Sequence, residues 1–328
     1  MADPAGPVWM PLVVWRRNDV ARDIVEFTLE RPDGGELAPF EPGAHVTVRT
    51  PAGSERKYSL VNPPAERCHF VIAVRRDGSG RGGSVSMTDG VAVGTIIEVS
   101  APENAFPLEG AAKRFLFIAG GIGITPVLGM IRALLAREAE GETAPPFKLL
   151  YLTRSPEDTA YLQEVTDAAL AGRVTLHHDH GDPGQAYDLW PLLERPAAGA
   201  HVYCCGPRGL MDAVRDMTGH WPDTSVHFES FSAGDAAMFE PNRPFTILLA
   251  RSGETIEVDA DQTALQALAA HGHRVMSSCE AGSCGTCRTT YLSGDVEHRD
   301  IVLGDDEKDD QIMVCVSRAR GGLLELDL

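Results

Sequence analysis

The chain has 328 residues, of which 43% are hydrophobic and 23% are charged, and its formal net charge is −18. This composition is that of a globular protein with two or three domains. The acidic balance argues against nucleic acid as a partner and suits either a basic protein surface or a solvated acidic exterior. No apolar run approaches the roughly 18 residues that span a bilayer, and residues 1–10 lack a secretory layout, so we expect a cytoplasmic protein with no membrane contact.

The first third is predicted to be rich in β-strands. Residues 23–30 largely alternate apolar and polar side chains, the period of a half-buried strand. Further short strands are predicted, separated by turn clusters at 31–35 and 51–53. These strands cover 11–16, 43–49, 70–74 and 95–99. The pattern predicts a small antiparallel β-barrel.

Two stretches of this third have the chemistry of a cofactor site. In the segment 56–60, Arg56 can pair with a phosphate, Tyr58 can lie against a planar ring and the Ser59 hydroxyl can reach a polar ring edge. Glycines and serines of 78–86 can cradle a phosphate with backbone N–H groups. Alone, the first stretch is also compatible with an ordinary strand, and the second with a flexible hairpin loop.

The middle third has the pattern of an α/β nucleotide-binding layer. An apolar strand at 115–119 leads into a turn with Gly120, Gly121 and Gly123, and a helix follows with Pro126 at its first position. This order places a pyrophosphate against a helix N-terminus, although the turn lacks the G-x-G-x-x-G fingerprint and a plain tight turn is the alternative.

Strands and helices continue to alternate, which predicts a parallel sheet. Strands are expected at 147–152, 173–177, 201–205 and 226–231, with helices at 161–171 and 209–217. Gly120, Arg154 and Cys205 then fall at carboxyl ends of strands, where such sheets bind ligands. Arg154 and Ser155 could also accept a 2′-phosphate. The histidines at 177, 178 and 180 fit a polar loop better than a metal site.

The last third is predicted to be β-grasp-like, with a hairpin at 244–258 and a helix at 263–270. Its most specific feature is the C-x4-C-x2-C spacing of Cys279, Cys284 and Cys287, completed by Cys315 on a predicted strand at 312–316. This is the plant-type spacing of a [2Fe–2S] cluster with four thiolate ligands. A zinc site fits less well, because structural zinc sites usually pair two short ligand motifs and here the last ligand is one isolated cysteine. A disulfide fits least.

Taken together, these motifs resemble the FMN- and [2Fe–2S]-containing reductases of Rieske-type oxygenases, the phthalate dioxygenase reductase family, along essentially the whole chain. The resemblance implies an FMN-binding β-barrel at 1–108 and an NAD(H)-binding, ferredoxin-reductase-like α/β domain at 109–232. A linker at 233–243 and a C-terminal β-grasp [2Fe–2S] ferredoxin domain at 244–328 would follow. The motifs that carry it are 56–60, 82–86, 120–126, 202–207, 226–231 and the four cysteines.

The resemblance also implies roles for individual residues. Arg56 would bind the FMN phosphate, Tyr58 would lie by the isoalloxazine, and Ser59 would lie near its reactive nitrogen. Ser59, Cys205 and Glu229 would lie near the flavin and nicotinamide, with none named as a certain catalytic group. The remaining FMN residues would be Leu60, Ala73, Val74, Arg75, Gly83, Ser84, Val85 and Thr125. The NADH residues would be Gly120, Gly121, Gly123, Arg154, Cys205 and Gly206.

The implied function is electron transfer from NADH, with NADPH as the alternative, through FMN and the cluster to a separate Rieske-type oxygenase that acts on an aromatic compound. The protein is expected to be a monomer. A haem-thiolate monooxygenase or an O-demethylase is the alternative partner. A zinc-containing nucleotide-binding regulatory module without turnover is the alternative from another class.

Overall fold

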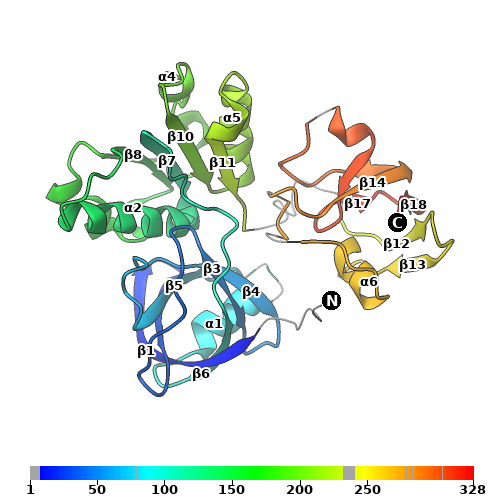
Figure 1. Cartoon of the computed structure of the whole chain (residues 1–328), viewed down its shortest axis with the longest axis horizontal. Helices are drawn as coiled ribbons and strands as arrows, with labels where there is room; N and C mark the ends of the chain where they lie inside the picture. Colours follow the sequence, from blue (N-terminus) through cyan, green and yellow to red (C-terminus); the bar gives the residue numbers. More distant parts are fainter. Residues whose placement is uncertain are drawn as a thin grey trace. The chain divides into compact units, whose positions relative to one another are not determined.

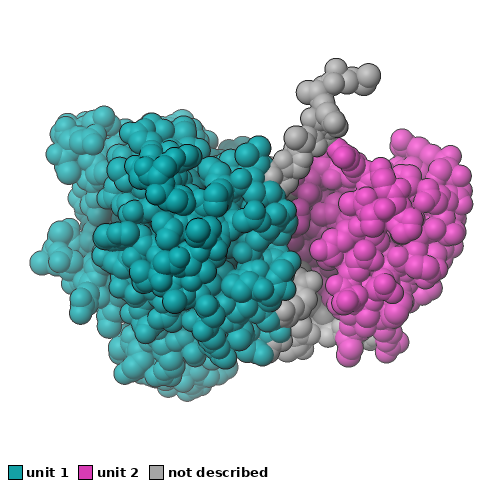
Figure 2. Space-filling view, turned by 90° about the horizontal axis from the view of Figure 1, so that it is seen from below, with its two compact units in different colours: residues 1–206, 213–227 teal, residues 207–212, 228–328 magenta. Residues whose placement is uncertain are grey.

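The computed structural model describes residues 8–78, 80, 82–231, 241–277, 280–282, 284–304 and 306–328. It divides into two compact units, which Figure 2 shows in different colours. The first comprises Met1–Gly206 and Ala213–His227, and the second comprises Pro207–Asp212 and Phe228–Leu328. Most of the predicted linker lies outside the described residues. None of the described helices is both long enough and apolar enough to cross a membrane.

The first unit begins with a six-stranded antiparallel sheet in the order β4-β3-β6-β1-β2-β5 (Figure 1). Its end strands β4 and β5 contact each other, so the sheet curls as the predicted barrel requires. Val14, Phe27, Val46 and Ile72 are fully buried in its core. The strands are β1 (Trp9–Ala21), β2 (Ile24–Glu30), β3 (His45–Arg49), β4 (Glu55–Ser59), β5 (His69–Arg75) and β6 (Ile96–Ser100).

A helix that the sequence did not predict, α1 (Gly83–Gly90), lies between β5 and β6. The loop expected over 78–86 therefore gives way to a helix at Gly83. Gly82 caps it in the left-handed conformation, with φ of 81°. The segment is poor in helix formers, but Met87 is fully buried in the barrel core. Packing of that side chain outweighs weak intrinsic propensity.

The predicted parallel sheet, in the order β11-β10-β7-β8-β9, lies in the first unit except for the end of β11. Its strands are β7 (Arg114–Gly120), β8 (Phe147–Thr153), β9 (Val174–His178), β10 (Ala200–Cys205) and β11 (Val226–Glu229). Its α-helices are α2 (Ile124–Ala139), α3 (Leu162–Val165), α4 (Trp190–Leu193) and α5 (Arg208–Thr218). The short 3₁₀ turns are η1 (Gly121–Gly123), η2 (Pro156–Asp158), η3 (Ala168–Leu170), η4 (Pro183–Gln185) and η5 (Asp223–Ser225).

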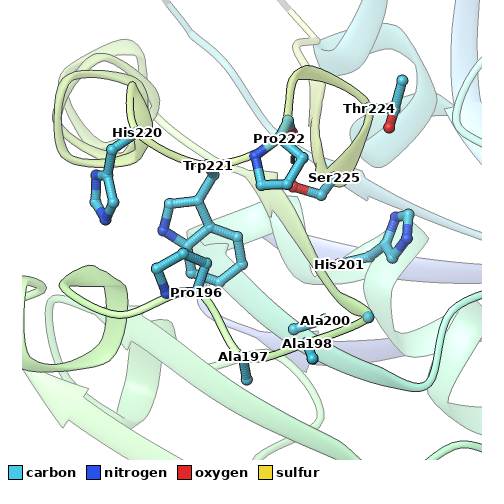
Figure 3. A pocket seen from close by; sticks show the side chains of 11 residues that line it. Pro196, Ala197, Ala198, Ala200, His201, His220, Trp221, Pro222, Thr224 and Ser225 are labelled. Carbon is cyan, nitrogen blue, oxygen red and sulfur yellow. Dashed lines mark hydrogen bonds between the residues drawn. The ribbon is translucent and has the colours of Figure 1, made fainter.

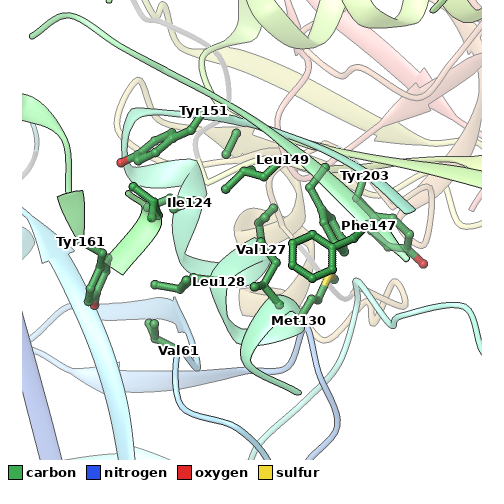
Figure 4. Close-up of a cluster of buried hydrophobic side chains, with 14 of the residues drawn as sticks. Val61, Ile124, Val127, Leu128, Met130, Phe147, Leu149, Tyr151, Tyr161 and Tyr203 are labelled. Atoms are coloured by element: carbon green, nitrogen blue, oxygen red, sulfur yellow. The ribbon is translucent and has the colours of Figure 1, made fainter. Parts of the chain in front are cut away.

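Helix α2 joins this sheet to the barrel. Val127 and Leu128 belong to one buried cluster with Leu149 of the sheet and Val61 of the barrel (Figure 4). A Cβ atom at Gly129 would lie only 2.5 Å from the Leu60 carbonyl oxygen, so the helix approaches the barrel backbone directly. The barrel and the parallel sheet therefore share one core.

Two predicted helix limits are wrong. The helix expected over 161–171 is broken into α3 and η3, because the Thr166 hydroxyl donates to the Leu162 carbonyl and Asp167 accepts from the Ala169 N–H. Such local side-chain bonds compete with a continuing helix. Pro126 is the third residue of α2 rather than the first, because η1 precedes the helix and Gly123 is its N-cap.

The second unit contains a five-stranded mixed sheet in the order β13-β12-β18-β14-β16. The predicted hairpin forms, and helix α6 (Ala264–Ala270) begins with a capping box of Thr263 and Gln266 and contacts β13. The strands are β12 (Phe245–Leu249), β13 (Thr255–Val258), β14 (Arg288–Ser293), β16 (Gln311–Met313) and β18 (Leu323–Leu326), with β15 (Val296–Glu297) pairing β17 (Arg318–Ala319) and a 3₁₀ turn η7 (Glu307–Asp309). The strand predicted at 312–316 ends at Met313, so Cys315 lies on the turn after β16.

Candidate cofactor sites

Strand β4 positions the first set of predicted cofactor residues. It pairs with β3 in a register that sets Arg56 opposite Val48, Tyr58 opposite Val46 and Ser59 opposite His45. Tyr58 packs against the barrel core, and burial raises the pKa of its phenol to about 12. The phenol therefore remains a neutral hydrogen-bonding group at ordinary pH.

Two side chains of β4 have buried polar atoms that find no hydrogen-bond partner among the described residues. These atoms are the Tyr58 hydroxyl and the Ser59 Oγ, and Ser59 is only 3% exposed. Buried polar atoms are nearly always paired, and leaving one unpaired costs about 1–3 kcal/mol. The ring edge and the ribityl hydroxyls of an FMN would together supply polar partners, so the residues present fit such a group.

The start of α1 lies beside Arg56. A Cβ atom at Gly83 would lie 3.1 Å from Arg56 Nε and 2.7 Å from Ser54 Oγ, so a larger residue would displace these two side chains. Ser84 Oγ accepts from the Asp77 N–H at 3.0 Å, and the first turn of α1 has no acidic residue. An arginine facing the N-terminus of a helix is suited to a phosphate. Ser79 and Arg81 of this glycine-rich stretch lie outside the described residues.

The glycine turn between β7 and α2 brings together the residues predicted for the nucleotide. A Cβ atom at Gly123 would lie 2.2 Å from the Cys205 carbonyl oxygen and 2.8 Å from the Gly206 nitrogen. Gly121 has a φ of 54°. Gly123 therefore allows the turn to pack directly on the end of β10, and Gly121 allows the left-handed backbone conformation within the turn.

The other predicted residues of this region lie around the same turn. Gly120 ends β7, and its parallel partner on β8 is Leu152, so the exposed Arg154 projects from the same edge of the sheet. Thr125 is buried, and its hydroxyl donates to the Ile122 carbonyl. The turn also contacts β5, which carries Ala73, Val74 and Arg75.

Glu229, at the end of β11, is 7% exposed and belongs to the second unit. The other predicted flavin and nucleotide residues all belong to the first unit.

The cluster ligands meet through the pairing of β14 with β16. Arg288 faces Met313 in this antiparallel ladder, so Cys287, just before β14, and Cys315, just after β16, come together. Both are almost fully buried, and a hydrogen bond from Cys315 lowers the pKa of the Cys287 thiol. Cys284 lies 3.1 Å from Thr286, measured from Sγ to Oγ1.

The loop around these thiols is turned by residues with positive φ, namely Glu280, Gly282 and Gly285. Cys279 lies outside the described residues. Within the described part of the chain, no set of three His, Cys, Asp or Glu side chains is grouped as a metal site. The polar loop expected for His177, His178 and His180 is wrong for the first two, which are the last residues of β9. There His178 bonds Thr153 and His177 bonds the Gln185 carbonyl.

A cavity of about 600 Å³ lies at the opposite edge of the parallel sheet, where β10 begins (Figure 3). Its lining includes His201, Trp221 and Ser225. Cys205 is at the other end of β10, so this cavity is separate from the nucleotide turn.

Sequence reasoning missed one polar residue of this region, His45. The signal available was a histidine at the start of a predicted strand, which by itself points to no function. Its position opposite Ser59 depends on the strand register, which the sequence does not reveal.

Comparison with known proteins agrees with these sites. Residues 117–216 match the oxidoreductase NAD-binding domain, and residues 247–320 match the 2Fe-2S iron-sulfur cluster binding domain. The chain is 52% identical over 317 residues to the phthalate 4,5-dioxygenase oxygenase reductase subunit of Pseudomonas putida, covering 97% of this chain and 96% of that one. The chain belongs to the phthalate dioxygenase reductase family.

Two solved structures are also similar. The first is a phthalate dioxygenase reductase described as a modular structure for electron transfer from pyridine nucleotides to [2Fe–2S], with a TM-score of 0.80, 51% identity and 98% coverage of both chains. The second is an intact type IV self-sufficient cytochrome P450 monooxygenase, with a TM-score of 0.69 and 37% identity, covering 98% of this chain and 41% of that one.

Membership of the phthalate dioxygenase reductase family confirms the predicted fold class, with its antiparallel sheet, parallel α/β layer and C-terminal cluster domain. It also confirms an NADH-dependent oxidoreductase and the predicted cofactors FMN, [2Fe–2S] and NADH. The assignment of individual residues to these cofactors stays a prediction.

Proposed function

We propose that this chain is the reductase component of a multicomponent oxygenase and passes electrons from NADH through FMN and a [2Fe–2S] cluster to a separate Rieske-type oxygenase. The observation that carries the proposal is the contact of α2 with the end of β4, at Gly129 and Leu60. α2 follows the glycine turn, and β4 carries Tyr58 and Ser59. A nicotinamide bound at the turn would lie near a flavin bound at β4.

The proposed FMN site would contact the cofactor at its phosphate and at its ring system. The Arg56 guanidinium and the N-terminus of α1 would bind the phosphate, because a helix N-terminus and an arginine both favour an anion. Tyr58 would lie against the ring system, and the Ser59 hydroxyl would bond its polar edge. The other proposed contacts are Leu60, Ala73, Val74, Arg75, Gly83, Ser84, Val85, Thr125 and Glu229.

The proposed NADH site lies where β7, β8 and β10 end. The N-terminus of α2 would face the pyrophosphate, and the glycines would let the backbone approach it closely. Arg154 would lie toward the adenosine ribose. The proposed residues are Gly120, Gly121, Gly123, Arg154, Cys205 and Gly206.

When bound, FMN would accept a hydride from NADH and deliver the two electrons singly to the cluster. The chain would hold the two rings in contact and exclude water from them. Hydride transfer between these cofactors requires no acid or base from the protein. Ser59, Cys205 and Glu229 are therefore proposed as neighbours of the reacting rings rather than as proton donors or acceptors.

The proposed acceptor is an oxygenase on another polypeptide. One relative, 52% identical, is named the phthalate 4,5-dioxygenase oxygenase reductase subunit, which supports an aromatic substrate for the partner. A net charge of −18 suits docking to a basic surface. A haem-containing monooxygenase is the second candidate. The similar cytochrome P450 monooxygenase contains, within one polypeptide, a region that matches 98% of this chain.

We further propose that the chain works as a monomer in the cytoplasm, with functional domains at 1–108, 109–232 and 244–328 joined by a linker at 233–243. The barrel and the parallel sheet share one compact unit. Limited proteolysis tests these domain boundaries. Cleavage is expected first within 233–243 and not near residue 108.

The deciding experiment is a visible spectrum of the purified protein, followed by anaerobic addition of NADH. Flavin and iron–sulfur bands that bleach with NADH are expected. The reduced protein is then mixed with a Rieske-type oxygenase component, or with a haem-thiolate monooxygenase, and reoxidation is followed. A colourless protein that binds zinc would overturn the proposal, and reoxidation by the haem protein alone would replace the Rieske-type partner.

A further inference from the structure

His45 is the most constrained polar residue next to the proposed flavin site. On one side its backbone lies in the β3–β4 ladder opposite Ser59. On the other side its N–H and carbonyl both bond Glu103, at 2.8 and 2.9 Å. The main chain at His45 is therefore fixed from two directions, and the position of its side chain follows.

The imidazole of His45 is buried without a hydrogen bond. The residue is 3% exposed, and neither Nδ1 nor Nε2 has a partner among the described residues. Glu103 Oε2 is 3.8 Å from Nε2, beyond hydrogen-bond distance. Burial, with a smaller contribution from the charge of Lys57, lowers the pKa of His45 to about 4. The ring is therefore neutral, with one N–H donor and one acceptor.

The strand opposite His45 carries a second buried polar side chain, that of Ser59. Residues directly opposite each other in an antiparallel ladder share a face, with Cβ atoms about 5 Å apart. The Ser59 Oγ is also buried and unpaired among the described residues. Two neighbouring polar side chains, both more than nine-tenths buried and both without a partner, point to a ligand that binds them together.

We propose that His45 is a further FMN-binding residue, which hydrogen-bonds the polar edge of the flavin beside Ser59. The inference rests on the proposed function, because it takes the flavin to lie at β4. A neutral imidazole suits this position, since it bonds the uncharged ring edge without bringing a buried charge. The unpaired nitrogens of His45 would then be satisfied by the cofactor rather than by the protein.

The test compares three variants, His45→Leu, His45→Asn and His45→Gln. Leucine removes both nitrogens, whereas the amides replace hydrogen-bonding atoms near Nδ1 or Nε2. Each apoprotein is titrated with FMN, and quenching of flavin fluorescence gives the dissociation constant. We expect His45→Leu to weaken FMN binding about tenfold and to shift the visible absorption of the bound flavin. At least one amide variant should restore both.

His69→Leu is the matched control, because His69 lies on β5 and pairs with Glu66 at the surface. Equal FMN affinity in His45→Leu and the wild type would overturn the inference, as would equal weakening in all three variants, which would indicate a packing role. Wild-type protein without any flavin would instead reject the proposed function. If leucine prevents folding, judged by circular dichroism, the two amide variants decide: unequal FMN affinities support the inference and equal losses overturn it.

Discussion

The proposed flavin and nucleotide residues come from many elements, among them β4, β5, α1, β7, η1, α2, β10 and β11, whereas three of the four proposed cluster ligands fall within the segment 279–287. In the first unit, the site depends on close approaches to glycines, such as that of the Arg56 side chain to Gly83 and that of the Cys205 backbone to Gly123. In the second unit, the cluster site depends on one loop and on the β14–β16 ladder that brings Cys287 to Cys315.

This difference in construction predicts a difference in response to mutation. A cofactor held by many weak contacts loses affinity in steps as each contact is removed. A cluster held by four covalent bonds to thiolates loses a whole ligand at once. The two regions are also separate compact units, so damage to one site should leave the other intact.

The largest effect is expected from Cys315→Ser. Loss of one thiolate should abolish the cluster, so that iron and acid-labile sulfide fall to background and transfer to a one-electron protein acceptor stops. Reduction of the flavin by NADH should continue, because the barrel and the parallel sheet are untouched. Cys68→Ser is the control, since Cys68 is an exposed free thiol. Loss of flavin reduction by NADH in Cys315→Ser would contradict the expectation that the two sites respond independently to mutation.

Arg56→Ala should weaken FMN binding about 10- to 100-fold, because a hydrogen bond to a charged group contributes about 1.5–3 kcal/mol. The variant should keep its cluster. Fluorescence titration of the apoprotein with FMN, together with iron analysis, measures both quantities. Arg137→Ala removes an exposed ion pair with Glu142 in the same unit and should change neither. Full flavin retention in Arg56→Ala would remove Arg56 from the site.

Gly123→Ala should act on the nucleotide without removing the flavin. The new Cβ would lie 2.2 Å from the Cys205 carbonyl oxygen, so the turn must move. We expect about 2 kcal/mol of lost stability and a higher KM for NADH, measured by thermal unfolding and steady-state kinetics. Gly110→Ala, where a Cβ meets nothing within 4 Å, should leave both values unchanged. An unaltered KM would separate this turn from the nucleotide.

The sequence predicts what depends on short spacing. The cysteine spacing, the apolar run before Gly120 and the segment 263–270 each specify a local structure within a few residues. The strand and the helix expected from the last two are found. What it does not predict depends on distant packing. Helix α1 forms because Met87 is buried in the barrel core, and the sequence of 83–90 alone favours a loop.

Register is the second limit of prediction from sequence. A one-residue slip between β3 and β4 would remove His45 from its position opposite Ser59. The break in the predicted helix at 161–171 has a different cause, since the Asp167 side chain caps η3 and so ends the previous turn. In the first case a pairing between distant strands decides the structure, and in the second a side-chain hydrogen bond within the predicted helix does.

The smallest effect is expected at the end of β8, where the sequence left NADH and NADPH both open. The Ser155 hydroxyl donates to Asp158 Oδ2 at 2.8 Å, and the carboxylates of Glu157 and Asp158 lie beside it, partly balanced by Arg22. A 2′-phosphate here would face these carboxylates, so Asp158→Asn should raise kcat/KM for NADPH several-fold relative to NADH, because removal of one like charge at a partly exposed site contributes about 1 kcal/mol. Glu142→Gln removes a surface charge elsewhere and should leave the ratio unchanged. An unchanged ratio in Asp158→Asn would mean that the adenosine ribose does not lie at this strand end, and that Arg154 does not contact it.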